Sequence, residues 1–466
     1  MPIAPPAAPT PEPQPLRAPY RPPSGGWDEM VAADGSVRPH WRSVAPLLSA
    51  SAASQLNSRA AAVRRLLQDH GVTYNVYDDA LGTSRPWELD LIPHIVDEAE
   101  FRQVARGLNQ RARLLEAILS DLYGSQRLLR ENLLPPALVY ACPGFLRSSV
   151  GTSPAGGRFL NLYACDLARD PQGLWRVMAD RTQTPSALGY ALENRTIIRQ
   201  VMAGEFQRAQ VQRLAGYYDR LRLTLQHLSP QGRLGEAGIL MLTPGPRDAT
   251  YFEHAFLARQ LGFPLVEGAD LTVRDRRVWL KTLEGLKRVD VVLRFLEDEW
   301  CDPLELRSSS HLGTPGLAEA WRSGSVSLAN GLGTGLVETP ALHPFLPALS
   351  RALLDEELLL PGVVTWWCGQ PQELKAVLDQ PARWVLKPAF VRGARDPLFL
   401  ADLSREELTA ALSQLRARPQ DWIAQERLNF STTPSLTSAG TVEPRPLVWR
   451  TLLSATQRGD YETLPG

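Results

Sequence analysis

Residues 238–267 constrain the fold of this chain more than any other segment. A short apolar run at 238–243 (GILMLT) precedes a Pro-Gly-Pro turn, a helical stretch at 250–261 and a second apolar run at 263–267 (FPLVE). This order predicts a strand, a crossover helix and a second strand parallel to the first. The chain is therefore expected to contain an open α/β sheet.

The carboxyl ends of such strands are where open α/β sheets bind their ligands. Thr243 ends the first predicted strand, and Arg294 ends another apolar run at 289–294. A hairpin predicted within residues 271–282 is expected to extend the same sheet. Thr243 and Arg294 are accordingly candidates for a substrate site, and Glu297 and Asp298 follow Arg294 closely enough to join it.

Composition narrows the possible partners. The chain has 466 residues, more than one simple core accommodates, so two or three subdomains are expected. Lys plus Arg and Asp plus Glu each number 50, so no net charge attracts nucleic acid or an anionic membrane. The four cysteines form no C-x-x-C pair, and there is neither a signal pattern nor an apolar run long enough to span a membrane. These features predict a cytoplasmic protein without nucleic-acid or membrane partners.

The first 230 residues divide by pattern. Residues 1–26 contain ten prolines and are predicted to be a disordered tail. Helical spacing predicts helices at 45–70 and 97–124, and a helical region follows at 192–228. Between them, two apolar runs within residues 157–178 flank an Asp-Pro-Gln-Gly turn, which predicts a hairpin.

Two segments near the end of the chain suggest a nucleotide site. Residues 384–388 (WVLKP) form a predicted buried strand with Lys387 near its exit, and residues 422–427 (WIAQER) form a second strand that carries Gln425 and Glu426. A lysine at such a position can hold phosphate oxygens as a point charge. The second strand can offer its backbone to adenine and its carboxylate to a ribose hydroxyl. The alternative is that Lys387 has no binding role and is a solvated charge at a strand end.

Several longer strings resemble the circularly permuted type 2 ATP-grasp proteins, relatives of glutathionylspermidine synthetase. The resemblance extends over roughly residues 27–466 and is strongest to the subgroup fused to a helical alpha-E domain. Since the chain stops soon after Tyr461, it is expected to be truncated at its C-terminus. The matching strings are RPWELDLIP (85–93), CPGFLR (142–147), YALENR (190–195), YFEHAFLAR (251–259), VEGADL (266–271), RVDVVLR (288–294), WWCGQ (366–370), VLKP (385–388) and AQE (424–426).

The resemblance implies a mixed α/β fold: a circularly permuted ATP-grasp fold with a Rossmann-like βαβ substrate-binding region and N-terminal helices. After the tail at 1–26, it divides the chain into three parts. Residues 27–230 hold the N-terminal helices and the permuted segment that bears the metal ligands. Residues 231–345 form the Rossmann-like region, and residues 346–466 form an incomplete nucleotide-binding region.

The resemblance also implies a reaction and its site. ATP phosphorylates a carboxylate of a small amino acid or peptide, and an amine attacks the acyl phosphate to form an amide. Lys387, Gln425 and Glu426 match the ATP-binding positions, and Arg445 resembles a late arginine directed at the phosphates or substrate. ATP and Mg²⁺ are the implied cofactors. The predicted catalytic residues are Arg294 and Arg445, and an alpha-E helical domain is the predicted partner.

Three departures from the family pattern weaken this expectation. The segment after Lys387 (389–396) has a single glycine where a glycine-rich loop is expected, so Arg392 and Arg395 are left to supply charge. The loop at 330–335 resembles a phosphate loop, but Pro340 stands where the family has a lysine.

The third departure concerns the metal. Ala179 and Arg181 stand where the family carries a Glu-x-Asn pair that binds Mg²⁺. Asp166 and Asp180 are left as the predicted metal ligands, with Glu193 and Asn194 nearby in the sequence. The alternative to a ligase is therefore a catalytically degenerate module that binds or scaffolds within a larger fusion protein.

Overall fold

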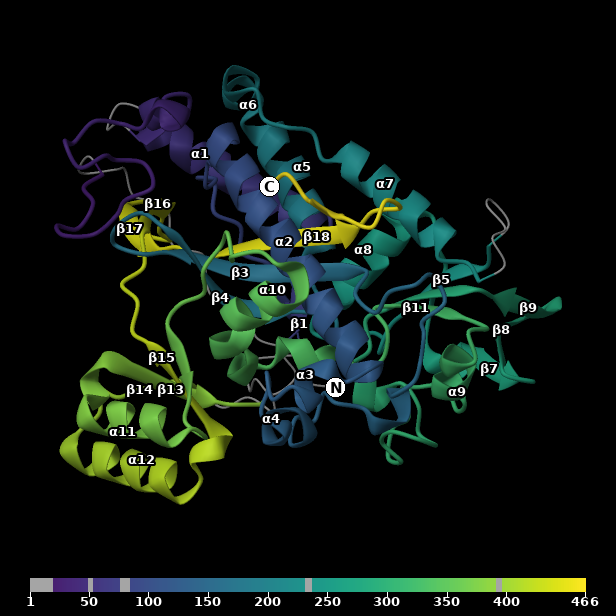
Figure 1. Ribbon diagram of the computed structural model, residues 1–466. Helices are drawn as coiled ribbons and strands as arrows, with labels where there is room; N and C mark the ends of the chain where they lie inside the picture. The colour runs from purple at the N-terminus through teal and green to yellow at the C-terminus, as the bar shows by residue number, and fades with distance from the viewer. Residues whose placement is uncertain (1–19, 49–52, 76–83, 231–236, 391–395) are drawn as a thin grey trace, which may run out of the picture.

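The predicted βαβ unit forms one side of a four-stranded parallel sheet, with its second strand at the edge. The computed structural model describes residues 20–48, 53–75, 84–230, 237–390 and 396–466 (Figure 1). The strands run in the order β11-β10-β5-β6, and all neighbours are parallel. They are β5 (Ile239–Leu242), β6 (Leu265–Val266), β10 (Val291–Arg294) and β11 (Ser327–Ala329), with α8 (Tyr251–Leu261) as the crossover helix. The prediction of a βαβ unit is confirmed.

Both faces of this sheet are covered, which explains why its strands read as continuous apolar runs. Met241 and Leu293 pack with helices α7 (Ala215–His227) and α8, whereas Leu240 and Val292 belong to the main core on the other side. The predicted hairpin does not extend this sheet. It forms a separate three-stranded sheet of β7 (Leu271–Arg274), β8 (Arg277–Thr282) and β9 (Gly285–Val289).

A second sheet joins distant parts of the chain. Its order is β19-β18-β3-β4, all antiparallel, so that late strands pair with early ones. The strands are β3 (Leu162–Arg169), β4 (Trp175–Arg181), β18 (Trp449–Ala455) and β19 (Tyr461–Thr463). The predicted hairpin is β3–β4, and Gly173 takes the positive φ of 85° that its turn requires.

One face of this second sheet is lined by the long helix α2 (Glu98–Tyr123), which was predicted at 97–124. Asp97 caps the helix by accepting hydrogen bonds from the N–H groups of Ala99 and Glu100. Leu108, Leu115 and Ile118 turn inward and join Tyr163 and Cys165 of β3 in the main core. The two elements therefore form one packed unit.

The predicted nucleotide strands lie in a third sheet, in the lobe at the lower left of Figure 1. Its antiparallel order is β12-β15-β13-β14. The elements of the lobe are β12 (Thr365–Trp367), β13 (Trp384–Pro388), β14 (Leu398–Phe399), β15 (Trp422–Glu426), α11 (Pro371–Asp379) and α12 (Arg405–Ala417). Leu386 and Ala424 pack with these helices, and Ser404 begins α12 with a capping box.

The remaining elements surround this frame. The helical region predicted at 192–228 is three helices, and the one predicted at 45–70 is a short 3₁₀ turn followed, after residues outside the described part, by α1. The other helices and strands are α1 (Ala53–Asp69), β1 (Thr73–Asn75), β2 (Ser84–Pro86), α3 (Arg127–Arg130), α4 (Pro136–Tyr140), α5 (Leu188–Val201), α6 (Ala203–Ala209), α9 (Leu317–Arg322), α10 (Leu346–Leu354), β16 (Thr432–Leu436) and β17 (Val442–Pro446).

The ends of the predicted domains are seen only in part. Of the predicted tail, residues 1–19 lie outside the described residues, while Tyr20 donates a hydrogen bond to Asp28. Among the described helices, none is both long and apolar enough to cross a membrane. The observed architecture is mixed α/β, as predicted.

Candidate functional site

Three side chains form a connected row across β12, β15 and β13. Strand alternation places Thr365, Gln425 and Lys387 on the face opposite the α11–α12 helices. Lys387 Nζ donates to Gln425 Oε1 at 2.6 Å, and Gln425 Nε2 donates to Thr365 Oγ1 at 3.1 Å. We call these three residues the clamp. The structure thus brings together two of the predicted nucleotide-binding residues.

The lysine of the clamp is not a solvated charge. Burial, and then the nearby Arg181 guanidinium, lower the pKa of the Lys387 ammonium below its ordinary value. Its one hydrogen bond to a neutral amide among the described residues leaves the ammonium charge without a carboxylate partner. An anion that binds Lys387 would therefore meet an ammonium group that the fold has already partly desolvated.

Glu426 does not join the clamp. It ends β15 on the opposite side of the strand and pairs with Arg383, with Arg383 Nη2 at 2.9 Å from Glu426 Oε1. Arg392, also predicted to bind the cofactor, lies outside the described residues.

Arg445 was predicted to act at the phosphates, but its side chain is exposed and pairs with Glu443 at 3.0 Å. It belongs to the β16–β17 hairpin, which is bound to the N-terminal part of the chain through Thr432–Asp28 and Ser435–Asp90 hydrogen bonds. Among the described contacts, none links Arg445 to the clamp. The structure does not bring this predicted catalytic residue to the site.

A different arginine takes the central position. Arg450 on β18 forms a bidentate pair with Asp166 on β3, at 2.7 and 3.0 Å. Arg181 on β4 approaches the same carboxylate at 3.4 Å and Glu338 at 3.5 Å. We call Asp166, Arg181, Glu338 and Arg450 the arginine cluster. Sequence reasoning missed Arg450, because its partner lies 284 positions earlier in the chain.

The clamp and the arginine cluster are held side by side by backbone hydrogen bonds. The segment that enters β12 runs beside β4, where Val177 donates to Pro361 O and accepts from Val363 N, both at 2.9 Å. The effect of Arg181 on the pKa of Lys387 shows that the two cations are electrostatic neighbours. Lys387 therefore lies near Arg181, which shares the Asp166 carboxylate with Arg450.

The predicted metal ligands do not form one site. Asp180 lies on the opposite face of β4, fully buried, where Arg111 binds both its oxygens at 2.7 Å. Tyr163 donates to it at 2.5 Å, and His343 lies 3.0 Å away. Burial raises the pKa of the Asp180 carboxyl, but the charges and hydrogen bonds of Arg111 and His343 outweigh this and hold the pKa well below its ordinary value.

The residues present do not fit Mg²⁺. Asp166 is already neutralised by two guanidinium groups, and the oxygens of Asp180 are used in the core. Glu193 pairs with His70, and Asn194 accepts from Trp87, so neither is near Asp166 through any described contact. Among the described residues there is no group of three or more His, Cys, Asp or Glu side chains that could hold a metal ion. Asp166 and Asp180, each predicted as a metal ligand, lie on opposite faces of the sheet, so the structure does not bring them together.

Arg294 is a structural residue. Its side chain is completely buried, and its nitrogens donate to the carbonyl oxygens of Leu296, Asn330 and Gly331 and to Asp298 Oδ1. The prediction that Arg294 holds a substrate carboxylate is therefore corrected, because its donors are spent on the protein. In the loop at 330–335, Asn330 and Gly331 supply two of these carbonyl oxygens and Gly333 N–H donates to Asp298, so these backbone groups bind the protein.

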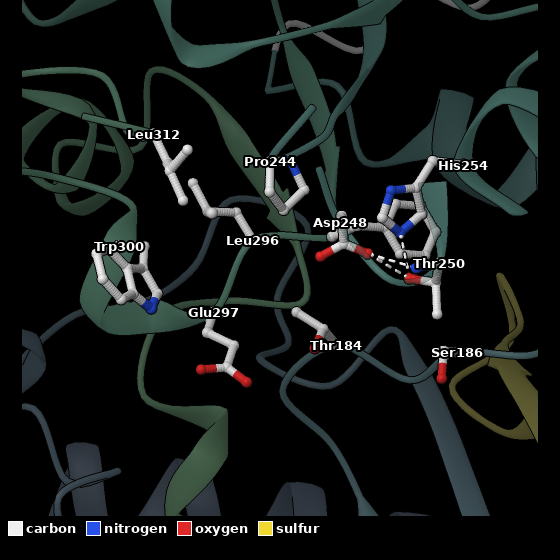
Figure 2. Close-up of a pocket in the computed structure, with 11 residues that line it drawn as sticks. Thr184, Ser186, Pro244, Asp248, Thr250, His254, Leu296, Glu297, Trp300 and Leu312 are labelled. Carbon is white, nitrogen blue, oxygen red and sulfur yellow. Dashed lines mark hydrogen bonds between the residues drawn. The ribbon is translucent and has the colours of Figure 1, made fainter. Parts of the chain in front are cut away.

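A pocket opens at the carboxyl ends of β5 and β10, where the sequence placed the substrate. Its volume is about 420 Å³, within the usual range for small-molecule sites (Figure 2). Its lining comes from the segments that follow β4, β5 and β10 and from the start of α8: Thr184, Ser186, Pro244, Asp248, Thr250, His254, Phe295, Leu296, Glu297, Trp300 and Leu312. Glu297, an expected member of the site, lies in it; Asp248 and Trp300 were not foreseen.

His254 fixes one wall of this pocket. Thr250 Oγ1 donates to Asp248 at 2.7 Å, so it accepts from His254 Nε2 at 3.2 Å (Figure 2). On the other side of the ring, His254 Nδ1 accepts from Thr243 Oγ1 at 2.9 Å. Burial lowers the pKa of the His254 imidazole to about 4. It is therefore neutral near pH 7, and both nitrogens are engaged in positioning the threonines.

These features agree with the comparisons to known proteins. The chain belongs to the circularly permuted ATP-grasp type 2 family, whose model matches residues 93–466. The fold resembles a glutathione synthetase-like effector of Globodera pallida in its apo form, with a TM-score of 0.60 and 14% identity over 88% of this chain and 93% of that one. The predicted family and fold class are confirmed.

Relatives of this chain occur in bacteria. An uncharacterized protein of Mycobacterium tuberculosis is 37% identical over 457 residues, which cover 95% of this chain and 50% of the relative. An uncharacterized protein of Synechocystis is 36% identical over 414 residues, 89% of this chain and 86% of the relative. The chain thus spans about half the length of the mycobacterial relative.

Proposed function

We propose that this chain is the nucleotide- and substrate-binding module of an ATP-dependent carboxylate–amine ligase that acts on a small amino acid or peptide. The observation that carries the proposal is the clamp beside the arginine cluster: in an ATP-grasp fold, the partly buried Lys387 has no carboxylate partner among the described residues and lies near Arg181. The anion proposed to bind there is ATP, because the chain belongs to an ATP-grasp family. The pocket beyond β5 and β10 would hold a substrate.

The residues suggest how the steps are divided. Lys387 exchanges its bond to Gln425 for phosphate oxygens, and Gln425 and the β15 backbone meet the base. Arg181 and Arg450 balance charge on the phosphates during transfer. The γ-phosphoryl group passes to a substrate carboxylate oxygen and ADP leaves. The amine nitrogen then forms the C–N bond as the C–O bond to phosphate breaks, with loss of one proton from the amine.

Turnover tests this proposal. ADP release is measured with candidate carboxylates and amines, singly and in pairs, for the unaltered chain, Lys387→Ala and Lys375→Ala. Lys375 is an exposed lysine on α11 of the same lobe and serves as the matched control. We expect ADP release that needs both substrates, is lost in Lys387→Ala and persists in Lys375→Ala. Release that is equal in both variants contradicts the proposal.

The arginine cluster also favours a second candidate, a module that binds without turnover. Two arginines occupy Asp166, and Asp180 serves the core, so the residues offer no metal site for phosphoryl transfer. Nucleotide binding without any ADP release, under every substrate pair and in the presence of Mg²⁺, would favour this candidate. Release of ADP that requires both substrates excludes it.

We also propose a partner domain and a cellular location for this protein. A fused alpha-E helical domain is the partner that the sequence resemblance implies. A cytoplasmic location is consistent with the four cysteines, all of which are buried and none of which forms a disulfide.

A further inference from the structure

The described lining of the pocket is acidic, whereas the neighbouring arginine cluster pairs two arginines with two carboxylates. Two of its eleven described lining residues, Asp248 and Glu297, are carboxylates, and none is a lysine or arginine. His254 adds no positive charge, because burial lowers its pKa to about 4. A ligand that enters this pocket therefore meets negative charge and threonine or serine hydroxyls.

Glu297 is the carboxylate that no protein cation neutralises. Among the described residues, its side chain has neither a hydrogen bond nor an ion pair. Glu297 is exposed and lies between Trp300 and Thr184 in Figure 2. The Arg294 charge acts on the Glu297 carboxyl, but its guanidinium binds Asp298, and Arg307 binds the neighbouring Glu299. Partial burial, followed by the charges of Glu338 and Glu299, raises the pKa of the Glu297 carboxyl.

Aromatic rings complete a surface suited to a cation. Trp300 lines the pocket, and the Arg307 guanidinium lies 3.7 Å from the centroid of its ring, which holds the indole in place. Phe295 stacks on His254 with ring centroids 4.4 Å apart. An aromatic wall next to an unpaired carboxylate binds alkylammonium groups through both charge and ring contacts. A carboxylate ligand would be repelled by Glu297 and Asp248.

The pocket also lies next to the proposed reaction centre. Thr184 is three residues beyond Arg181, and Glu338 connects the two places. Glu338 pairs with Arg181 and accepts from the N–H groups of Thr182 and Gln183, both at 3.0 Å. The same Glu338 acts on the pKa of Glu297. A ligand in the pocket is thus within electrostatic range of the cluster where the acyl phosphate would form.

We propose that this pocket is the amine subsite and that it selects a small alkylamine in its ammonium form, with Glu297 as the ion-pair partner. The proposal rests on the proposed ligase function, because only a ligase would use the bound amine as a substrate. It concerns the binding step. Glu297 would determine the specificity for the amine. Asp248, with Thr250 and His254, would line the opposite wall of the pocket. A carboxylate group of an amino-acid substrate would bind outside this pocket.

A charge series of one shape tests this subsite. n-Butylamine, n-butanol and butyrate are titrated separately into the chain without nucleotide, and binding is followed by NMR chemical shifts of pocket residues. We expect saturable shifts with n-butylamine alone, weakened by added salt. Equal binding of n-butanol, or preferential binding of butyrate, would overturn the proposal.

Two variants assign the effect to one carboxylate. Glu297→Gln should weaken n-butylamine binding by about tenfold. Glu299→Gln is the matched control, since Glu299 is a neighbouring exposed carboxylate that is already paired with Arg307 at 2.8 Å; we expect less than about a twofold change there. Equal losses in both variants would mean a diffuse charge effect and would overturn the assignment.

The binding test and the turnover test fail separately. If n-butylamine binds through Glu297 but no substrate pair releases ADP, the ligase function fails while the cation site stands. If substrate pairs release ADP and Glu297→Gln leaves the amine KM unchanged, the ligase function stands and the amine subsite fails.

Discussion

The two faces of the β3–β4–β18 sheet differ in how deeply their aspartate–arginine pairs are buried. On the face toward α2, Asp180 is fully buried and bound by Arg111, Tyr163 and His343. On the other face, Asp166 is bound by two partly exposed arginines. Strand alternation alone separates these aspartates. The comparison shows that one strand pair supplies a structural ion pair on one side and a candidate ligand site on the other.

The largest expected effect lies on the buried face. Arg111→Ala leaves Asp180 charged and buried without its main partner, which should lower the free energy of unfolding by about 3–5 kcal/mol. Urea denaturation of Arg111→Ala and of Arg113→Ala measures this. Arg113 pairs with the partly exposed Glu356 at 3.1 Å, so its loss should cost no more than about 1 kcal/mol. Similar losses in the two variants would contradict the distinction between the faces.

A second buried carboxylate shows what happens without an arginine in contact. Glu253 on α8 is fully buried and accepts hydrogen bonds from the N–H groups of Ala187 and Gly189, at 2.7 and 3.0 Å. Burial raises the pKa of its carboxyl to about 7, against an ordinary value of 4.5. Because the folded state holds this proton more tightly, Glu253 stabilises the fold below pH 4.5 and loses that contribution as the pH rises through 7.

Glu253→Gln should therefore remove this dependence. The free energy of unfolding of Glu253→Gln, relative to the unaltered chain, should rise by about 3 kcal/mol between pH 4.5 and pH 8. The relative measurement is needed because His254, whose pKa is lowered to about 4, gives the opposite slope between pH 4 and 6.5 in both proteins. A difference that does not change with pH would show that Glu253 is charged in the fold at neutral pH.

The smallest expected effect on stability is that of replacing Asp166, on the face of the sheet that carries the arginine cluster. There the effect on ATP binding is more informative than the effect on stability. Asp166→Asn should change stability by no more than about 1 kcal/mol, because both arginines are partly exposed. Freed from Asp166, Arg181 and Arg450 should bind ATP several-fold more tightly, with or without Mg²⁺. Calorimetric titration checks this, and Asp402→Asn, which breaks an exposed pair with Arg427 in the nucleotide lobe, is the control. Loss of a Mg²⁺-dependent component in Asp166→Asn would instead identify Asp166 as a metal ligand.

Local patterns predicted most of the frame. The apolar run of β5, the helical spacing of α2 and the Asp-Pro-Gln-Gly turn of β3–β4 each depend on neighbouring residues, and each was found where expected. Alternation along β13 and β15 likewise explains why Lys387 and Gln425 meet. The family resemblance supplied the meaning of that contact.

The rest depends on pairings that no local pattern shows. Arg450 meets Asp166 only because β18 pairs with β3, and Arg294 is buried only because the loop at 330–335 folds over it. Whether an aspartate near a strand end faces a core helix or the ligand side changes with a single step in register. For this reason sequence reasoning misplaced Asp180. Arg445 was misplaced because its hairpin binds the N-terminal part of the chain, and Arg450 was missed because its partner strand lies far away in the sequence.

The central claim is that Lys387 belongs to a nucleotide site, and ATP binding tests it most directly. Isothermal titration of ATP into the unaltered chain, Lys387→Ala and Lys375→Ala compares a half-buried lysine of the clamp with an exposed lysine of the same lobe. We predict that Lys387→Ala weakens ATP binding by about tenfold or more, while Lys375→Ala leaves it unchanged. Equal affinities in all three proteins, or no ATP binding to the unaltered chain, would contradict the account.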